Sequence, residues 1–130
     1  MSKEVISTTS APAAIGPYSQ AVRTGELVFL SGQIPLVPQT MELVSEDIAE
    51  QARQIFKNLS AVAIAAGGSL DQLVKVNLYL TDLGDFQRVN EVMEEFFTAP
   101  YPARAAVGVA SLPRGAAVEA EAVMAAPQGS

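Results

Sequence analysis

Residues 45–68 read SEDIAEQARQIFKNLSAVAIAAGG, and residues 69–81 read SLDQLVKVNLYLT. The first stretch predicts a helix, because its apolar residues recur at the spacing of one helical face. Ser45 is the expected N-cap, with two acidic residues directly after it that favour the positive end of a helix. Gly67 and Gly68 supply the stop.

The second stretch predicts a half-buried strand that follows this helix. Apolar residues alternate there with other side chains, at Val74, Val76, Leu78 and Leu80. A second helix is expected after Gly84, and it ends before Pro100 because a proline disfavours helical geometry in the residue before it. Its apolar stripe consists of Phe86, Val89, Met93, Phe96 and Phe97.

Strand patterns lie on both sides of this central unit. Residues 20–23 and 27–31 flank a turn and predict one hairpin, and a short strand is also possible near Val5. Residues 104–110 and 117–125 flank another turn and predict a second hairpin. The order of elements therefore predicts one α+β domain over residues 1–130, with a mixed sheet.

The two expected helices can cover only one face of such a sheet. The strands are too apolar to leave the other face in water, and only 17% of the residues are charged against 49% hydrophobic. Association of several copies would cover this face and would place clefts at the subunit boundaries, where ligands tend to bind.

Composition excludes several classes of function. The chain has no cysteine and no histidine, which removes disulfides, thiolate zinc sites, cysteine nucleophiles and the imidazole base. The net charge is -6 and the eight basic residues are scattered, which argues against a nucleic-acid partner. The first ten residues are polar and the longest apolar run, 61–66, is far too short to span a membrane. We expect a cytoplasmic protein that does not bind membranes.

Arg104 is the first candidate for chemistry. Strand alternation places it on one face with Ala106 and Gly108, so that a guanidinium points across small residues. Such a group suits a bidentate grip on a planar carboxylate. The alternative is a structural or interface salt bridge.

Glu119 and Glu121 are the second candidates, because they share one face of an otherwise small and apolar strand. Across the predicted hairpin, one of them would lie within a rung or two of Arg104, although the turn does not fix the register. A carboxylate there could orient water or shuttle a proton. The alternative is a solvated sheet face, which fits Glu121 better than Glu119.

Further polar residues interrupt apolar segments. Tyr18 could close a pocket and donate a hydrogen bond, and Gly32, directly after Ser31, would let a ligand approach the backbone. Each is alternatively ordinary turn chemistry. Asn90, on the second predicted helix, is alternatively a solvated residue.

Taken together, these segments resemble the reactive intermediate deaminase family, called RidA or YjgF-like, along nearly the whole chain. The matching stretches are AIGPYSQA at 14–21, SGQIP at 31–35, YPARAAV at 101–107, LP at 112–113 and VEAEA at 118–122. The resemblance implies a chorismate mutase-like α+β fold with two helices on one face of the sheet. It also implies a homotrimer with a central β-barrel and sites between subunits.

The implied activity is hydrolysis of 2-iminopropanoate and 2-iminobutanoate, which arise from 2-aminoacrylate-type enamines, to 2-keto acids and ammonia, without a cofactor or metal. By this resemblance Arg104 holds the substrate carboxylate and Glu119 positions or activates water. The residues expected to line the site, through side chains or backbone, are Tyr18, Ser31, Gly32, Asn90 and Ala106.

Two positions depart from the family pattern. Met41 stands in a turn where the family often has glycine, which puts only the conformation of that turn in doubt. Ala106 stands where many members carry cysteine, so thiol modification cannot regulate this site.

Other functions remain open at this point. Arg104 could grip keto acids in a metabolite-binding or regulatory module without turnover. A ribonuclease or translation inhibitor is disfavoured by the acidic charge and the missing histidine. A mutase acting on a dicarboxylate would require more cations than this one arginine.

Overall fold

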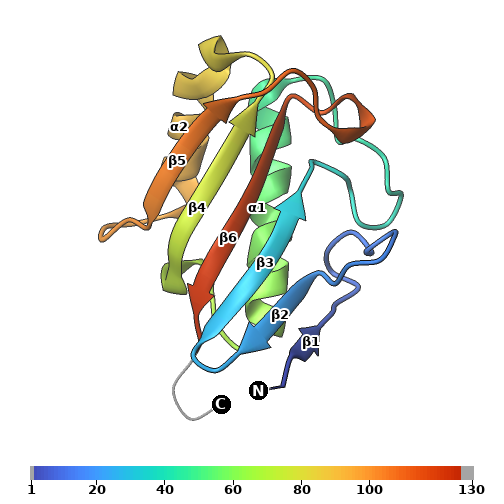
Figure 1. The fold of residues 1–130 in the computed structure, drawn as a ribbon. Coiled ribbons are helices and arrows are strands. Elements are labelled where there is room, and N and C mark those ends of the chain that lie inside the picture. Colours follow the sequence, from blue (N-terminus) through green and yellow to red (C-terminus); the bar gives the residue numbers. More distant parts are fainter. Residues whose placement is uncertain (1, 127–130) are drawn as a thin grey trace.

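The chain folds around one sheet of six strands in the order β1-β2-β3-β6-β4-β5, as a computed structural model that describes residues 2–126 shows (Figure 1). The strands are β1 Glu4–Ile6, β2 Ala21–Thr24, β3 Leu27–Gln33, β4 Leu73–Leu80, β5 Ala103–Gly108 and β6 Val118–Ala125. The helices are α1 Ile48–Ala65 and α2 Phe86–Phe96, and short 3-10 turns span Leu70–Gln72, Leu83–Asp85 and Pro113–Gly115. The predicted α+β class and mixed sheet are confirmed.

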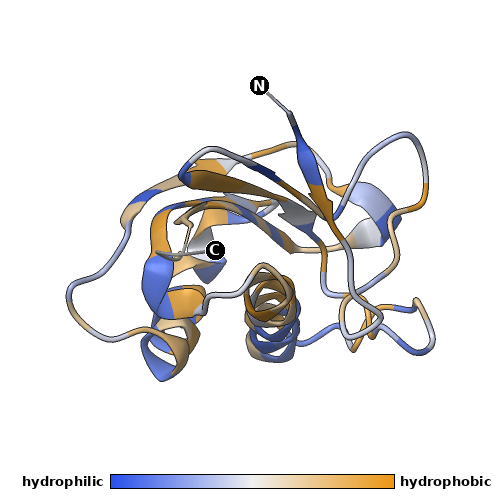
Figure 2. Cartoon of the chain, turned by 90° about the horizontal axis from the view of Figure 1, so that it is seen from below, coloured by the Kyte–Doolittle hydropathy of each residue, from blue (hydrophilic) through white to orange (hydrophobic). Residues whose placement is uncertain are grey.

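Both helices lie on one face of the sheet, as predicted (Figure 2). Strands β4 and β5 are parallel and are joined through α2, whereas every other pair of neighbouring strands is antiparallel. The β2–β3 hairpin and the short β1 strand are also confirmed. Among the described residues, none of the helices is long and apolar enough to cross a membrane.

The second predicted hairpin is wrong, because β5 and β6 do not pair. Strand β4 lies between them, parallel to β5 and antiparallel to β6. Strand β6 instead enters the centre of the sheet between β3 and β4, where its alternate residues, Val118, Ala120, Ala122 and Met124, are buried on the helix side. A central position buries this strand better than an edge position would. The connection from β5 to β6, which contains the turn at Pro113–Gly115, passes over the end of β4 to reach this position.

The core lies between the sheet and the helices. Phe56 of α1 is fully buried and its ring centroid lies 5.6 Å from those of Phe96 and Phe97, which fixes α2 against α1. Helix α1 begins at Ile48 with Asp47 as its N-cap, and the Asp47 carboxylate accepts a hydrogen bond from the Glu50 N–H at 3.0 Å.

Two local predictions in this region are therefore wrong. Ser45 is not the N-cap; its hydroxyl oxygen accepts from the Asp47 N–H at 3.1 Å and so shapes the turn before the helix. Val74 is 46% exposed rather than buried, and Leu73 is 4% exposed. The pairing of β4 with β6 shifts register between Leu73 and Lys75, which breaks the alternation at this end of the strand.

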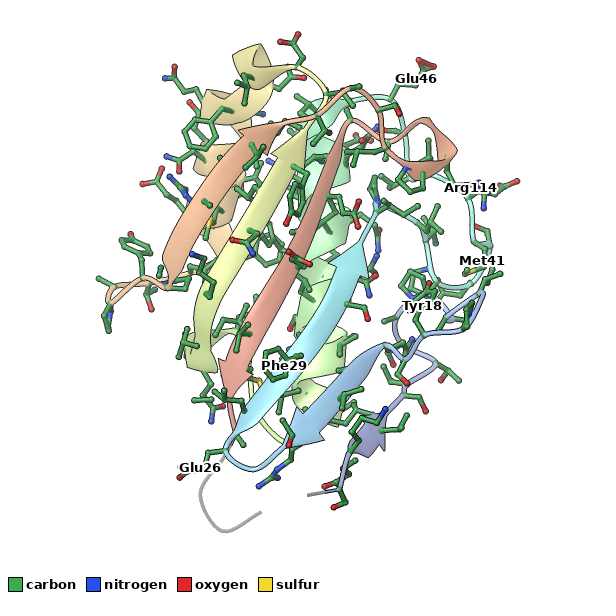
Figure 3. The ribbon with its side chains drawn as sticks, viewed as in Figure 1. Tyr18, Glu26, Phe29, Met41, Glu46 and Arg114 are labelled. Atoms are coloured by element: carbon green, nitrogen blue, oxygen red, sulfur yellow. The ribbon has the colours of Figure 1, made fainter. Side chains whose placement is uncertain are left out.

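The opposite face of the sheet carries no helix, and we call it the open face (Figure 2). Phe29 and Leu27 of β3 and Val107 of β5 lie there, and each is more than 40% exposed. Figure 3 shows Phe29 on the side of the sheet away from α1. The expected apolar face without a cover is thus present in the single chain.

Candidate functional site

Arg104 lies on the edge strand β5, level with Val76 of β4, and its side chain packs against helix α2. Its Nη1 donates to Asn90 Oδ1 at 2.5 Å, and its guanidinium carbon lies 5.0 Å from the centroid of the Phe86 ring. The amide and the ring face orient the guanidinium while leaving its positive charge unneutralised.

A hollow of about 360 Å³ surrounds this guanidinium. It is lined by Asn90, Met93, Glu94, Tyr101, Pro102 and Arg104. Within residues 2–126, Arg104 forms no ion pair, and both ion pairs of this region involve other arginines, Arg53 and Arg88. A salt-bridge role inside one chain is therefore contradicted, and the fork of N–H donors is available to a carboxylate.

Glu119 lies on β6, opposite Tyr79 of β4 and on the open face. Its carboxylate packs against the backbone of Gly32, at the irregularity in β3 between Leu30 and Gln33. A Cβ at position 32 would come within 2.1 Å of Glu119 Oε2. The absence of a side chain at Gly32 thus lets the Glu119 carboxylate pack against the strand. In the single chain, Glu119 occupies the space beside the Gly32 backbone that was expected for a ligand.

Burial raises the pKa of the Glu119 carboxyl group above its ordinary value, and the negative charge of Glu121 adds to the rise. A raised pKa suits a group that takes up a proton and returns it near neutral pH. Glu121 is not simply solvated, because its Oε2 accepts hydrogen bonds from the Tyr79 hydroxyl at 2.5 Å and from Asn77 Nδ2 at 3.2 Å.

Tyr18 and Gly32 line a second hollow of about 250 Å³ beside Arg114 and Met41. Tyr18 is 52% exposed, and its hydroxyl oxygen accepts from the Ile15 N–H at 3.4 Å. The Ser31 hydroxyl donates to the Ser19 carbonyl at 2.5 Å, so that its hydrogen is used to hold the loop before β2.

The structure divides the predicted site into two parts. Arg104, Asn90 and Ala106 belong to the helix side, where Ala106 stands level with the buried Leu78. Glu119 faces the open side, next to Gly32. The expectation that Glu119 or Glu121 lies within a rung or two of Arg104 is wrong, because β4 separates the strands and the side chains point to opposite faces.

Sequence reasoning missed several residues near these two parts. Arg114 lines the Tyr18 hollow, and its Nη2 donates to the Met41 carbonyl at 3.2 Å (Figure 3). Met41 has φ of 60°, so the turn keeps the left-handed backbone typical of glycine. Tyr79 lies opposite Glu119 in the sheet, and sequence reasoning did not place it near the site. The one signal in the sequence was its position in the alternation of β4, which puts it on the face away from the buried residues. The described residues contain no group of three or more acidic side chains that could hold a metal ion.

Comparison with known proteins places this geometry in a family. The family model described as Endoribonuclease L-PSP matches residues 8–126, and this is the YjgF/RidA family. The chain belongs to this family. The resemblance first drawn from the sequence motifs is thereby confirmed.

Relatives match this RidA-family chain over nearly its whole length. A RutC family protein, y4sK of Sinorhizobium fredii, is 54% identical over 93% of this chain and 96% of its own. The 2-iminobutanoate/2-iminopropanoate deaminase of Dermatophagoides farinae is 48% identical over 94% of this chain and 95% of its own.

Solved structures agree with the fold. RidA from an Antarctic Psychrobacter superposes with a TM-score of 0.91 at 52% identity, covering 94% of this chain and 98% of its own. E. coli TdcF with bound serine superposes with a TM-score of 0.90 at 45% identity, with the same coverage of 94% and 98%.

Proposed function

We propose that this chain hydrolyses 2-imino acids, of the 2-iminopropanoate and 2-iminobutanoate type, to 2-keto acids and ammonia. The observation that carries the proposal is the Arg104 guanidinium, which Asn90 and Phe86 orient in a hollow and which forms no ion pair with an acidic side chain of residues 2–126. A planar carboxylate is the ligand that this arrangement fits best. The proposal includes a homotrimer and a cytosolic location.

The reaction needs little from the protein beyond orientation and proton transfer. With the carboxylate on Arg104, the protonated imine presents an electrophilic carbon to water. The water oxygen bonds to this carbon while one of its protons passes to Glu119. Glu119 returns the proton to the amine nitrogen, the C–N bond breaks, ammonia leaves and the hydroxyl proton is released as the keto group forms.

The division of the site between two faces supports an assembly in which two subunits complete each site. Arg104 of one subunit would meet Glu119, Gly32 and Tyr18 of its neighbour. The exposed apolar residues of the open face, Phe29 among them, support the same assembly, because burying them would remove hydrophobic surface from water. A closed ring of three copies, with the sheets lining a central barrel, fits this requirement.

Names and ligands of relatives support the chemistry. Besides the mite protein, the mouse and human relatives, at 48% and 46% identity, are 2-iminobutanoate/2-iminopropanoate deaminases. TdcF binds serine, an amino acid whose α-carboxylate is the group we assign to Arg104. Other relatives carry only the RutC family name, so a carboxylate-binding module without turnover is the second candidate.

The family description names an endoribonuclease, and a ribonuclease would act on a polyanion. This chain carries a net charge of -6 and contains no histidine. Its site has one oriented arginine on the helix side rather than a basic track for a phosphate backbone. The charge distribution therefore favours a small carboxylate over RNA.

The test generates 2-iminopropanoate in situ from alanine with an amino acid oxidase and follows pyruvate and ammonia. Wild type should accelerate their release, whereas Arg104→Ala and Glu119→Gln should not. Arg88→Ala is the matched control, because Arg88 pairs with Glu91 on the exposed face of α2. Binding of a keto acid by an intact wild-type oligomer that gives no acceleration would support the binding module instead.

A further inference from the structure

Four polar side chains form a cluster in the middle of the open face. Asn77 and Tyr79 come from β4, and Glu119 and Glu121 come from β6. The register pairs Asn77 with Glu121 and Tyr79 with Glu119, so the four side chains occupy two adjacent cross-strand positions. We call these residues the open-face cluster. Glu119 alone among them has a role in the hydrolysis described above.

Glu121 is held more firmly than a solvated surface carboxylate. One of its oxygens, Oε2, accepts from both the Tyr79 hydroxyl at 2.5 Å and Asn77 Nδ2 at 3.2 Å. Within the described part of the chain, Glu121 has no ion pair with a cation. Neutral donors therefore fix its position without cancelling its charge.

The proton of this short contact stays on the tyrosine. The hydrogen bond to Glu121 raises the pKa of Tyr79 above its ordinary value, and burial and the charges of Glu121 and Glu119 raise it further. The Tyr79 hydroxyl thus remains a donor to the Glu121 carboxylate at neutral pH. This carboxylate sits on the same face as Glu119 and two residues further along β6.

We propose that Glu121 is a positioning residue for Glu119: a fixed negative charge, held by Tyr79 and Asn77, that makes Glu119 a stronger proton acceptor during imine hydrolysis. The inference rests on the proposed function, in which Glu119 takes a proton from the attacking water and returns it to the leaving amine. Like charges on one strand face disfavour two ionised carboxylates, so the charge held on Glu121 favours proton uptake by Glu119.

Within the single chain, the charge that acts on Glu119 is that of Glu121, and in the proposed assembly Arg104 of the neighbouring subunit would face it as well. Tyr79 faces it from β4, and the uncharged Gly32 faces it from β3. Lys75 stands on the same face of β4, level with Val123 and beyond Asn77, and it forms no ion pair in the described residues. Arg114 lines the hollow next to Gly32 and donates to the Met41 carbonyl.

The test follows the carboxyl carbon of Glu119 by NMR in protein labelled with ¹³C at glutamate carboxyl groups. Glu121→Gln removes the charge and keeps an amide oxygen that can still accept from Tyr79. We expect the titration midpoint of Glu119 to move to lower pH, and the limb of the kcat-pH profile that depends on Glu119 to move in the same direction. Glu26→Gln is the control, because it removes the same charge at an exposed residue of the turn before β3, and the next residue, Leu27, pairs with Ala125 at the end of β6 opposite Glu119 (Figure 3).

A second substitution protects the test against a folding defect. Glu121→Thr removes the same charge with a residue suited to a strand, and it should move the midpoint of Glu119 in the same direction. Glu121→Asp keeps the charge and should retain most of the wild-type midpoint. If the wild type is active and the titration midpoint of Glu119 is unchanged in Glu121→Gln and Glu121→Thr, the role of Glu121 is overturned while the proposed function stands. A wild type without deaminase activity overturns the proposed function and this role with it.

Discussion

Arg104 and Glu119 lie on opposite faces of the same sheet, with strand β4 between them. Arg104 stands level with Val76 and packs toward α2, whereas Glu119 stands level with Tyr79 and faces away from both helices. A sheet is a continuous hydrogen-bonded layer, so neither side chain can reach through it to the other. If both act on one substrate, they must come from different copies of the chain.

This relationship predicts complementation between two inactive variants. Arg104→Ala and Glu119→Gln should each be inactive, because every site in either oligomer lacks one group. In the proposed ring of three copies, every oligomer that contains both variants has about one third of its subunit boundaries combining an intact Arg104 with an intact Glu119. Co-expression with two different tags, followed by purification through both, should give mixed oligomers with a corresponding share of wild-type activity.

The control for complementation mixes each inactive variant with itself under the same two tags. These oligomers should stay inactive. Doubly tagged oligomers of the two variants that form in good yield and show no activity would contradict a site shared between subunits.

The second prediction concerns the shape of the cation. Arg104→Lys keeps the charge but replaces a planar fork with a point charge, and it loses the contacts to Asn90 and to the face of Phe86. A lost charge-assisted hydrogen bond contributes about 1.5–3 kcal/mol, so kcat/KM should fall by roughly 10- to 100-fold. Thermal unfolding should barely change, because Arg104 is an exposed residue on an edge strand. Activity equal to wild type in this variant would rule out a bidentate grip.

The third prediction separates the position of Glu119 from the stability of the fold. Gly32→Ala would bring a Cβ within 2.1 Å of Glu119 Oε2, and the end of a flexible side chain can move aside. The fold should therefore survive, whereas a displacement of about 1 Å in a catalytic group can cost roughly 100-fold in rate. Steady-state kinetics and thermal melts of the same preparation check both halves of this statement.

Gly25→Ala is the matched contrast to that variant. Gly25 has φ of 59° in the β2–β3 turn, and nothing lies within 4 Å of the position of an added Cβ. An alanine there costs about 1–2 kcal/mol of backbone strain and touches no site residue. We expect a lower Tm with unchanged kcat. A Gly32→Ala variant with a lower Tm and an unchanged kcat would show that the contact between Gly32 and Glu119 serves only packing.

Periodicity was sufficient to predict the local elements. The helical spacing of Ile55, Phe56 and Leu59 and the alternation of Val76 and Leu78 depend on burial of one face, which a single segment records in its own sequence. The N-cap was misplaced because Ser45 and Asp47 are both good caps, and only the bond to Glu50 N–H decides between them.

Strand order was beyond the same reasoning. Residues 104–110 and 117–125 carry every signal of a hairpin, yet β6 lies between β3 and β4, where every second residue of the strand is buried. This order also decides the site, because it moves Arg104 and Glu119 apart. Family motifs pointed to both residues as candidates, since a motif records chemistry without recording which copy of the chain supplies each group.

The fourth prediction concerns the open face. Phe29 is 46% exposed in the single chain and stands on β3 beside Val123 of β6. Phe29→Lys places a charge that could be buried only at a large cost if this face lies between subunits. Light scattering after size exclusion should then report smaller species than wild type. An exposed charge at Lys57 on α1 offers the contrast, because Lys57→Glu should leave the oligomer unchanged.

The last prediction follows from the titration of Glu119. Its pKa in the folded protein is raised above the ordinary value of 4.5, first by burial and then by the charge of Glu121. The folded state therefore holds this proton more tightly than the unfolded state does. The contribution to stability is fully present below the unfolded pKa and is lost as the pH rises through the raised folded pKa. Above the raised folded pKa, ionised Glu119 destabilises the fold relative to its protonated form.

Glu119→Gln removes this dependence while keeping the shape of the side chain. The variant should unfold at a higher urea concentration than wild type at about pH 7.5, and the difference should shrink toward zero at about pH 4. The two proteins must be compared at one protein concentration, because dissociation of subunits also contributes to the midpoint. A variant that is less stable than wild type at neutral pH would mean that ionised Glu119 is compensated by a partner that the single chain does not supply, and the neighbouring Arg104 of the shared site would be the first such partner to test.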